Sequence, residues 1–505
     1  GEGAVALQGF ERGSVNVWDV TGGAPTIVED VVVTPDGATF STGFRDAEFV
    51  AFSEPLSISG LTPLGRGDLR EETPSAEYVI IAHGSLVESA RTLADYRASQ
   101  GLSTLVLDVR EVYDAYGDGV ATSAALEAFI RDAYRRWDVP PRYLFLVGDG
   151  TFDPRGRLGF SDNLITPRMY SSASGKFASD SSMGDLGVEP GYSVAVGRLP
   201  AHTPEEVSVY VEKVQAFETS ATGLADAAFI LADNPDDGGD FDLSLELALE
   251  SFGQGLQASG VVVNPTDLDD ARDQLFAAID LGTRYLHFIG HGGLDGLAGE
   301  RILAQEDITS LANAESPFVL LAAACLLGRF DVPGIRALSE ELLLTPGVGA
   351  AAVFASAGLE ANERSTALGR LMGELIGETR HRRIGSVVAE ASTLAPGLSI
   401  PRDSLRLHTL LGDPALMLTA DASEWAPYER PTPPPTDTPS LPIPTEPEGE
   451  ADAPASTPPA AGGETTNQGS PTERPTMSAS GCQASPPPGW LLFAWIPFWV
   501  RRRSR

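Results

Sequence analysis

The feature that constrains the fold most is an alternation of two kinds of segment after about residue 77. Short, continuous apolar runs such as 77-EYVIIAH-83 and 143-YLFLVGDG-150 alternate with segments of helical spacing such as 86-LVESARTLADYRASQG-101. Continuous apolar runs of strand length are typical of parallel strands buried on both faces, which helices then cover. The pattern predicts an α/β fold of two adjacent units, with further strands at 102–109, 228–233, 261–265, 285–291, 317–325 and 348–357 and further helices near 123–137, 243–260 and 270–282.

Residues 1–72 follow a different pattern, in which polar and apolar positions alternate, as in 14-SVNVWDV-20, between turn signals such as Gly22-Gly23. Such alternation is typical of half-buried strands and predicts a β-rich N-terminal domain. We place the two α/β units at residues 77–220 and 221–420. Because the chain begins at Gly1 without Met, inside strand-like sequence, we expect its true N-terminus and any signal peptide to be missing.

The last part of the chain changes composition. Residues 421–480 are rich in Pro, Thr, Ser, Glu and Ala, which cannot bury enough apolar surface to fold, so we expect an extended, disordered linker. Residues 481–505 combine a Gly-Cys pair, an aromatic-rich apolar stretch and a terminal Arg cluster. At about 1.5 Å per residue, the apolar stretch from Trp490 to Val500 covers only about half of a bilayer core of about 30 Å.

This order of motifs resembles the C-terminal sorting signals of exported bacterial proteins, whose basic end stays in the cytoplasm. The resemblance implies that Cys482 is a processing or lipid-attachment point and that export and sorting machinery are partners. It also implies a location at the cell surface or outside the cell. A frayed amphipathic tail with an incidental cysteine is the alternative. The length of the tail is equally consistent with removal after export and with a transient membrane anchor.

Charge and cysteine content restrict the function further. The chain has 35 basic and 70 acidic residues, a formal net charge of -35, which argues against nucleic acid as a partner because phosphate binding needs clustered Lys and Arg. Its two cysteines, Cys325 and Cys482, are too far apart and too few to form a disulfide framework. Cys325 therefore needs its own explanation.

Two apolar runs end on one reactive side chain each: 285-YLHFIGHGG-293 on His291 and 317-PFVLLAAACLLGRFD-331 on Cys325. Ligand sites of open α/β sheets lie outside the carboxyl ends of the strands, so these two side chains can meet there. A thiol needs a nearby base to become a nucleophile, and a histidine can later protonate the leaving amine. Gly292 and Cys325 can each offer a backbone N–H to an oxyanion, which suits acyl transfer. The alternative is that Cys325 is a small buried hydrophobe and His291 a loop residue.

The blocks around His291 and Cys325 resemble the paired His and Cys blocks of the gingipain-type cysteine peptidases, which have a caspase-like fold. Further blocks agree with the family in its order, over about Glu77 to Leu418: 143-YLFLVGDG-150, 177-FASDSSMGDL-186, 194-VAVGRLPAHTPEE-206 and 409-TLLGDPAL-416. The resemblance implies an endopeptidase with Cys325 as nucleophile and His291 as general base and acid. It also implies that backbone N–H groups near Gly292 and Cys325 form the oxyanion hole, and that the chemistry requires no cofactor.

The sequence departs from the family in two places. Gingipains have an acidic residue before the VGR block that supports the histidine, whereas this chain has Tyr192 and Ser193 there. Asp185 or Glu189 can orient His291 instead, although a role as solvated loop acids is favoured for both. The segment 355-ASAGLEANERS-365 lies where the family builds its P1 pocket, and it lacks the aromatic wall of the Arg-specific members. Glu360 or Glu363 can receive a basic P1 side chain, yet a surface role is favoured, so Arg specificity is not implied.

The acid-rich stretch 233-DNPDDGGDFD-242 follows a predicted strand and resembles a calcium loop in residue type, because carboxylates are the hard oxygen ligands that Ca²⁺ prefers. It lacks the EF-hand spacing, but gingipain-type peptidases often bind structural calcium. A solvated acidic loop is the alternative. The candidate ligands for a structural Ca²⁺ are Asp233, Asp236, Asp237, Asp240 and Asp242.

We therefore expect an exported, surface-tethered cysteine endopeptidase that acts on proteins or peptides. A maturation protease or transpeptidase of a secretion pathway is one alternative. A non-catalytic surface-binding module on the same fold is the other.

Overall fold

The computed structural model describes most of the chain as far as Leu418. The described residues are 3–8, 10, 15–20, 26–34, 37–42, 49–53, 68–71, 74–160, 163–172, 175–188, 190–220, 227–378 and 383–418. The predicted linker, the C-terminal signal with Cys482, and Glu189 lie outside the described residues. The chain divides into two compact units, Gly1–Leu64 and Gly65–Arg505.

The N-terminal unit is β-rich, as predicted. It holds two antiparallel three-stranded sheets, ordered β1-β5-β4 and β3-β2-β6. Alternate residues of its strands point inward, and Val17, Ala38 and Phe40 form its small core. The strands are β1 (Gly3–Gln8), β2 (Asn16–Asp19), β3 (Thr26–Ile27), β4 (Val32–Thr34), β5 (Gly37–Thr42) and β6 (Phe49–Phe52).

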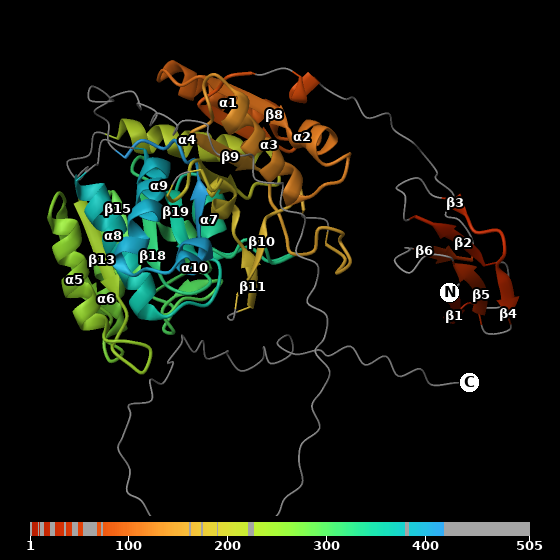
Figure 1. Cartoon of the computed structure of the whole chain (residues 1–505). Helices are drawn as coiled ribbons and strands as arrows, with labels where there is room; N and C mark the ends of the chain where they lie inside the picture. Colours follow the sequence, from red (N-terminus) through yellow and green to blue (C-terminus); the bar gives the residue numbers. More distant parts are fainter. Residues whose placement is uncertain are drawn as a thin grey trace, which may run out of the picture. The chain divides into compact units, whose positions relative to one another are not determined.

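The larger unit is built on one ten-stranded sheet with the order β14-β13-β15-β18-β19-β20-β12-β9-β7-β8 (Figure 1). The α/β fold is confirmed, and the two predicted units each contribute one side of the same sheet. The strands are β7 (Tyr78–Ala82), β8 (Thr104–Asp108), β9 (Tyr143–Val147), β12 (Ala195–Leu199), β13 (Ala227–Ala232), β14 (Gln257–Val262), β15 (Tyr285–Ile289), β18 (Phe318–Ala323), β19 (Ala350–Ser356) and β20 (His408–Gly412). Two small hairpins accompany it, β10 (Met169–Ser172) with β11 (Gly175–Ala178) and β16 (Gly296–Leu297) with β17 (Leu303–Ala304).

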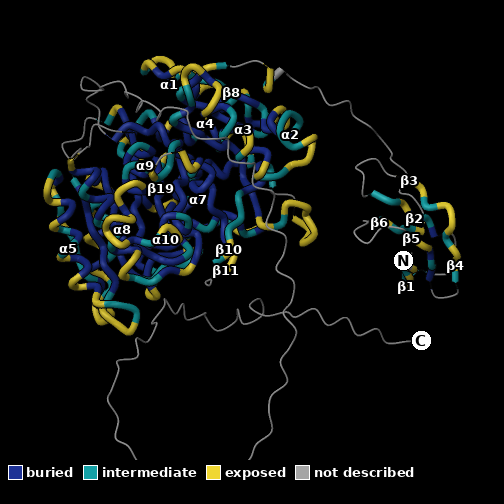
Figure 2. Tube along the Cα trace, viewed as in Figure 1, coloured by how far each residue is buried: buried dark blue, intermediate teal, exposed yellow. Residues whose placement is uncertain are grey.

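Helices cover the sheet because its strands are apolar on both sides. On β7, Ile81 belongs to the core cluster that includes α2 and α3, whereas its neighbour Ile80 belongs to the cluster that includes α1 and α4. Figure 2 shows buried residues in the middle of this unit and exposed ones on the surrounding helices and loops. The helices are α1 (Val87–Ser99), α2 (Val109–Tyr116), α3 (Ser123–Arg136), α4 (Pro204–Thr219), α5 (Phe241–Gly253), α6 (Leu268–Asp280), α7 (Leu338–Leu344), α8 (Asn362–Glu378), α9 (Ile384–Leu394) and α10 (Arg402–Leu407). None of the described helices is long and apolar enough to cross a membrane.

The predicted boundary between the helix at 243–260 and the strand at 261–265 is wrong. Helix α5 ends at Gly253, and β14 already begins at Gln257. The reason is a close approach of α8: a Cβ at Gly255 would lie 2.2 Å from the Gly377 carbonyl oxygen. The connection at Gly255 packs against the backbone of α8, which leaves no room for a side chain at this position.

The direction of the strands determines where side chains can meet. The sheet contains two sets of parallel neighbours, β14-β13-β15-β18-β19 and β12-β9-β7-β8. Strand β20 lies between the two sets and runs antiparallel to β19. Residues beyond the ends of the two sets touch: the Phe152 N–H, after β9, donates to the Asp331 carbonyl, after β18, at 2.9 Å. The Arg198 guanidinium of β12 also lies 4.9 Å from the centre of the Phe330 ring. We call this side of the sheet, where the parallel strands end, the carboxyl edge.

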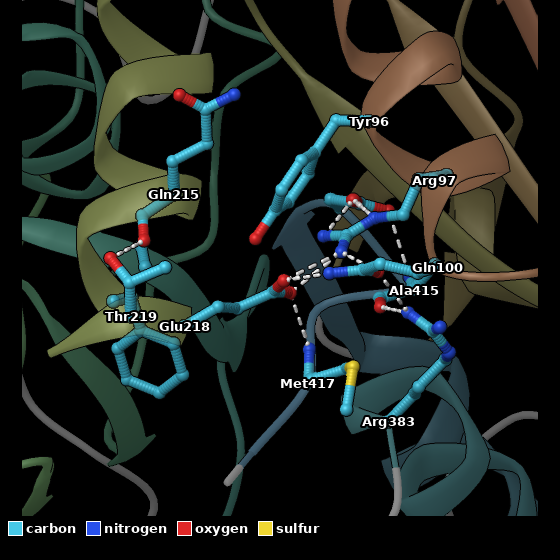
Figure 3. Close-up of polar contacts among 12 residues, drawn as sticks. Tyr96, Arg97, Gln100, Gln215, Glu218, Thr219, Arg383, Ala415 and Met417 are labelled. Atoms are coloured by element: carbon cyan, nitrogen blue, oxygen red, sulfur yellow. Dashed lines mark hydrogen bonds and ion pairs between the residues drawn. The ribbon is translucent and has the colours of Figure 1, made fainter. Parts of the chain in front are cut away.

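A buried polar cluster occupies the opposite side, the amino edge (Figure 3). The Arg97 guanidinium lies 2.7 Å from the Glu218 carboxylate and 2.6 Å from that of Asp413, and all three side chains are almost fully buried. Asp413 follows β20, whose antiparallel pairing brings it to the amino end of β19. The Met417 N–H also donates to Glu218, at 2.8 Å. The cluster therefore anchors the segment that follows β20.

Candidate active site

His291 follows the end of β15 at the carboxyl edge. Glycine is required at position 290, because a Cβ there would lie 2.4 Å from the Cβ of Asp233. Asp233 follows β13, the neighbour of β15, and its carboxylate accepts a hydrogen bond from the His291 N–H at 3.0 Å. Burial raises the pKa of Asp233, and hydrogen bonds from the backbone N–H groups of His291 and Asn234 oppose that rise. Asp233 thus fixes the backbone of His291.

Cys325 lies beside the His291 loop. Strands β15 and β18 are parallel neighbours, and their register pairs Ile289 with Ala323. If this register is continued for two residues beyond the strands, position 291 lies opposite position 325. The two loops are in close backbone contact, since a Cβ at Gly292 would lie 2.4 Å from the Cys325 carbonyl oxygen. The loops that carry the predicted histidine and cysteine are therefore neighbours at the carboxyl edge.

The imidazole of His291 is held by groups from the β13–α5 loop. Its Nε2 lies 2.9 Å from Oδ2 of Asp236, and the two side chains are 20% and 42% exposed. The ring packs edge-on against Phe241 with centroids 5.7 Å apart. A Cβ at Gly238 would lie 2.5 Å from Cε1 of the ring, so this glycine lets the loop approach the histidine. Asp236 is thus an acidic partner that can orient His291 and stabilise its protonated form.

The Cys325 thiol is buried and contacts both backbone groups of one residue, Glu360. The residue is 2% exposed. Its Sγ accepts a hydrogen bond from the Glu360 N–H at 3.4 Å and lies 3.5 Å from the Glu360 carbonyl oxygen, to which its S–H donates. The next residue, Leu326, has a φ of 64°, which is unusual for a side chain of this size. Its N–H donates to the Gly358 carbonyl at 3.2 Å, which helps to hold this conformation beside the thiol.

The Gly292 N–H is a backbone donor directly after His291. The His291 N–H binds Asp233, and the Gly293 N–H donates to the Gly296 carbonyl at 3.1 Å. The N–H of Gly292, between them, has no acceptor within the described part of the chain. A donor of this kind next to a nucleophile can bind the negative charge that develops on a carbonyl oxygen.

Of the two acids considered as partners of His291, Asp185 lies near Arg402 instead, in keeping with its favoured role as a loop acid. Oδ2 of Asp185 lies 3.9 Å from Nη1 of Arg402, and Glu189 lies outside the described residues. Sequence reasoning missed Asp236 as the partner of His291, because five aspartates lie in one stretch and their residue type does not distinguish them. The pair Gly238-Gly239 was the available signal, since glycines in a loop often mark a close backbone approach.

The predicted surface role of Glu360 is wrong. Its side chain is 2% exposed, and its carboxylate faces Nδ1 of His408 at 3.5 Å. The reason is that β20, which begins with His408, inserts beside β19 and covers the segment that follows β19. Glu363 is exposed at the start of α8, in keeping with its predicted surface role.

The five aspartates predicted as calcium ligands make different contacts in the structure. Asp233 and Asp236 contact His291, and the Asp240 side chain accepts the Leu243 N–H at 3.1 Å at the start of α5. Asp237 and Asp242 are exposed. Across the described ranges, no three His, Cys, Asp or Glu side chains are grouped so that they could hold one metal ion. Calcium binding by this loop stays a prediction.

Comparisons with known proteins identify the family and the fold of the chain. The family model of peptidase family C25 matches residues 71–419. No curated protein matches the chain. Among solved structures, the complex of the Porphyromonas gingivalis RgpB pro- and mature domains aligns with a TM-score of 0.56 and 18% identity, over 68% of this chain and 79% of that one. The crystal structure of the Arg-specific cysteine proteinase gingipain R (RGPB) aligns with a TM-score of 0.56 and 18% identity, over 71% and 80% of the two chains.

These structural matches show a common fold, and the family model covers most of the chain. The resemblance seen in the His and Cys blocks is thereby confirmed, and the cysteine peptidase family implies peptide substrates. The chain belongs to peptidase family C25 and has the gingipain fold.

Proposed function

We propose that the chain is an active cysteine endopeptidase in which Cys325 is the nucleophile and His291 the general base and acid. The observation that carries the proposal is the register of β15 and β18, which brings His291 level with Cys325. The Gly292 N–H supports it, because an oxyanion donor is needed beside the nucleophile. The contact between Asp236 and Nε2 of His291 supports it as well, since a carboxylate partner can orient the imidazole of a catalytic histidine.

The reaction proceeds in two steps. His291 removes the proton from Cys325, and the thiolate attacks the carbonyl carbon of the scissile peptide bond. The N–H groups of Gly292 and Cys325 bind the oxyanion of the tetrahedral intermediate. As the C–N bond breaks, His291 returns the proton to the leaving amine, and a thioester remains. His291 then deprotonates a water molecule that attacks the thioester, which releases the carboxylic acid product and restores the thiol. Asp236 stabilises the imidazolium during both steps.

We also propose that the enzyme is exported and tethered at the cell surface. The order of the Gly-Cys pair, the apolar stretch and the Arg cluster in residues 481–505 supports this location. It makes export and sorting machinery a partner and Cys482 the processing point. A maturation protease or transpeptidase of a secretion pathway would use the same acyl-enzyme, with an amine in place of water in the second step.

A P1-scanning peptide library tests the proposal, with the full chain compared with Cys325→Ala, each with added Ca²⁺ and with a chelator. We expect cleavage that Cys325→Ala abolishes, and the preferred P1 residue follows from the same data. Loss of cleavage on chelation would support the calcium prediction, and unchanged cleavage would contradict it. Added amine nucleophiles that become joined to the product would favour the transpeptidase.

A negative result is also informative if thiol reactivity is measured beside it. A catalytic thiolate reacts with iodoacetamide faster than a buried structural thiol. Absence of cleavage of the whole library, together with slow alkylation of Cys325, would overturn the proposal and favour a non-catalytic binding module on the same fold.

A further inference from the structure

Glu360 contacts the nucleophile through its backbone and another buried residue through its side chain. Its N–H and carbonyl oxygen lie 3.4 Å and 3.5 Å from Sγ of Cys325. Its carboxylate lies 3.5 Å from Nδ1 of His408, and both side chains are 2% exposed. Burial of a carboxylate costs free energy unless a partner compensates it. A glutamate buried at this position, directly beside the nucleophile, therefore calls for an explanation.

His408 is fixed by three different parts of the fold. Its Nδ1 donates to the Ser404 carbonyl at 2.8 Å, so this nitrogen carries a hydrogen whether or not the ring is charged. Its ring stacks on Phe354 with centroids 5.3 Å apart. Its backbone carbonyl accepts a hydrogen bond from the Ser181 hydroxyl at 2.8 Å. His408 is thus a rigid support for the Glu360 carboxylate.

The segment between Ser356 and Glu360 also holds the chain after Cys325. The Leu326 N–H donates to the Gly358 carbonyl at 3.2 Å, and the Gly328 N–H donates to the Ser356 carbonyl at 2.9 Å. A displacement of Glu360 would therefore move both the groups that touch the sulfur and the loop that carries it. The position of the sulfur depends on where this segment is anchored.

We propose that Glu360 and His408 form a positioning pair for Cys325. His408 holds the Glu360 carboxylate and thereby keeps the Glu360 peptide on the sulfur, where its carbonyl accepts the thiol hydrogen and its N–H stabilises the thiolate. Neither side chain takes part in a bond-making step. This inference rests on the proposed function and identifies residues that set the geometry of its nucleophile.

Substitutions at both positions in the full chain test the pair. His408→Phe keeps a flat ring against Phe354 but removes the Nδ1 donor, and Glu360→Ala removes the carboxylate. We expect each to lower kcat by about ten- to a hundredfold, with KM changed by less than about threefold, because the nucleophile is displaced while the substrate site persists. Alkylation of Cys325 by iodoacetamide, followed by peptide mass spectrometry to separate it from Cys482, should slow by about tenfold in both.

Conservative and double variants separate positioning from general stability. His408→Asn and Glu360→Gln keep a polar side chain on each side of the pair and should retain most of the activity. The double variant Glu360→Ala/His408→Phe should be no worse than either single variant, since the two residues act as a unit. Tyr285→Phe is the matched control: it removes a buried hydrogen bond of 2.7 Å to the Leu418 carbonyl at the amino edge. It should lower stability without changing kcat per folded molecule.

The outcomes distinguish this inference from the proposed function. Unchanged alkylation and unchanged kcat in folded His408→Phe or Glu360→Ala would overturn the positioning pair, as would losses that multiply in the double variant. If the unaltered chain cleaves no peptide, the proposed function fails, but the alkylation rates still support or overturn the pair. Should His408→Phe not fold, Glu360→Ala, which leaves the stacking of His408 on Phe354 in place, decides the question.

Discussion

Two groups of charged side chains, one at each edge of the large sheet, differ in how far they are buried. At the amino edge, Arg97, Glu218 and Asp413 are almost fully buried and pair with one another. At the carboxyl edge, His291 and Asp236 form a pair that is 20% and 42% exposed. Removing one member of a buried pair leaves an unsolvated charge, whereas the survivor of an exposed pair is solvated by water. The comparison indicates that the His291–Asp236 pair contributes little to stability, whereas the buried cluster anchors the segment that follows β20.

The largest expected effect is on activity, at the carboxyl edge. His291→Ala should lower kcat/KM for peptide cleavage by about a hundred- to ten-thousandfold, because general acid and base catalysis is lost. Its free energy of unfolding should change by less than about 1 kcal/mol, since the side chain is partly exposed. Peptide cleavage and urea unfolding of the same preparation check both numbers. A large loss of stability in His291→Ala would remove the contrast between the edges.

The next largest effect is on stability, at the amino edge. Arg97→Met leaves two buried carboxylates without their cation and should lower the free energy of unfolding by about 3–5 kcal/mol. Denaturant unfolding measures the change, and kcat per folded molecule should stay as in the unaltered chain. A matched variant is the exposed Arg91→Met on α1, whose guanidinium lies 3.8 Å from Glu88 and which should change stability by less than about 0.5 kcal/mol. Equal effects of the two substitutions would contradict the assignment of stability to the buried cluster.

Asp331, a buried acid at the carboxyl edge, sharpens the comparison. Unlike the buried cluster at the amino edge, its charge is expected to lower the stability of the protein. Burial raises the pKa of Asp331 to about 6, although the nearby Arg329 guanidinium opposes the rise. Because its folded pKa lies above the unfolded value, the stabilising contribution of Asp331 is full below about pH 4 and is lost as the pH rises through about 6. Its ionised form therefore destabilises the protein at neutral pH.

Asp331→Asn should accordingly stabilise the protein at neutral pH, by as much as about 3 kcal/mol at pH 8, and change little at pH 4. Unfolding in urea at both pH values checks this prediction. A gain of equal size at both pH values would mean that ionisation of Asp331 is not its cause.

Most of the strands could be predicted from the sequence, because continuous apolar runs mark buried parallel strands. The neighbouring positions of the loops that follow β15 and β18 could be predicted as well, because such loops gather at the carboxyl ends of parallel strands. Contacts that depend on the order of strands in the sheet could not be predicted from the sequence. Asp236 meets His291 only because β13 lies beside β15, and Glu360 is buried only because β20 inserts next to β19. Sequence reasoning also extended α5 too far, because the approach of Gly377 to Gly255 is a packing contact between distant segments.

The smallest expected effect tests whether Asp236, rather than the acidic loop as a whole, supports His291. Asp236→Asn keeps the shape of the side chain but removes the charge that lies 2.9 Å from Nε2, so kcat/KM should fall by about ten- to a hundredfold. Stability should change by less than about 0.5 kcal/mol, because the pair is exposed. Asp273→Asn, at an exposed position on α6, removes the same charge elsewhere and should leave kcat/KM unchanged. If both variants lose activity equally, the effect comes from the overall charge of this acidic protein. If neither does, His291 acts without Asp236, and the carboxyl edge relies on Cys325 and His291 alone.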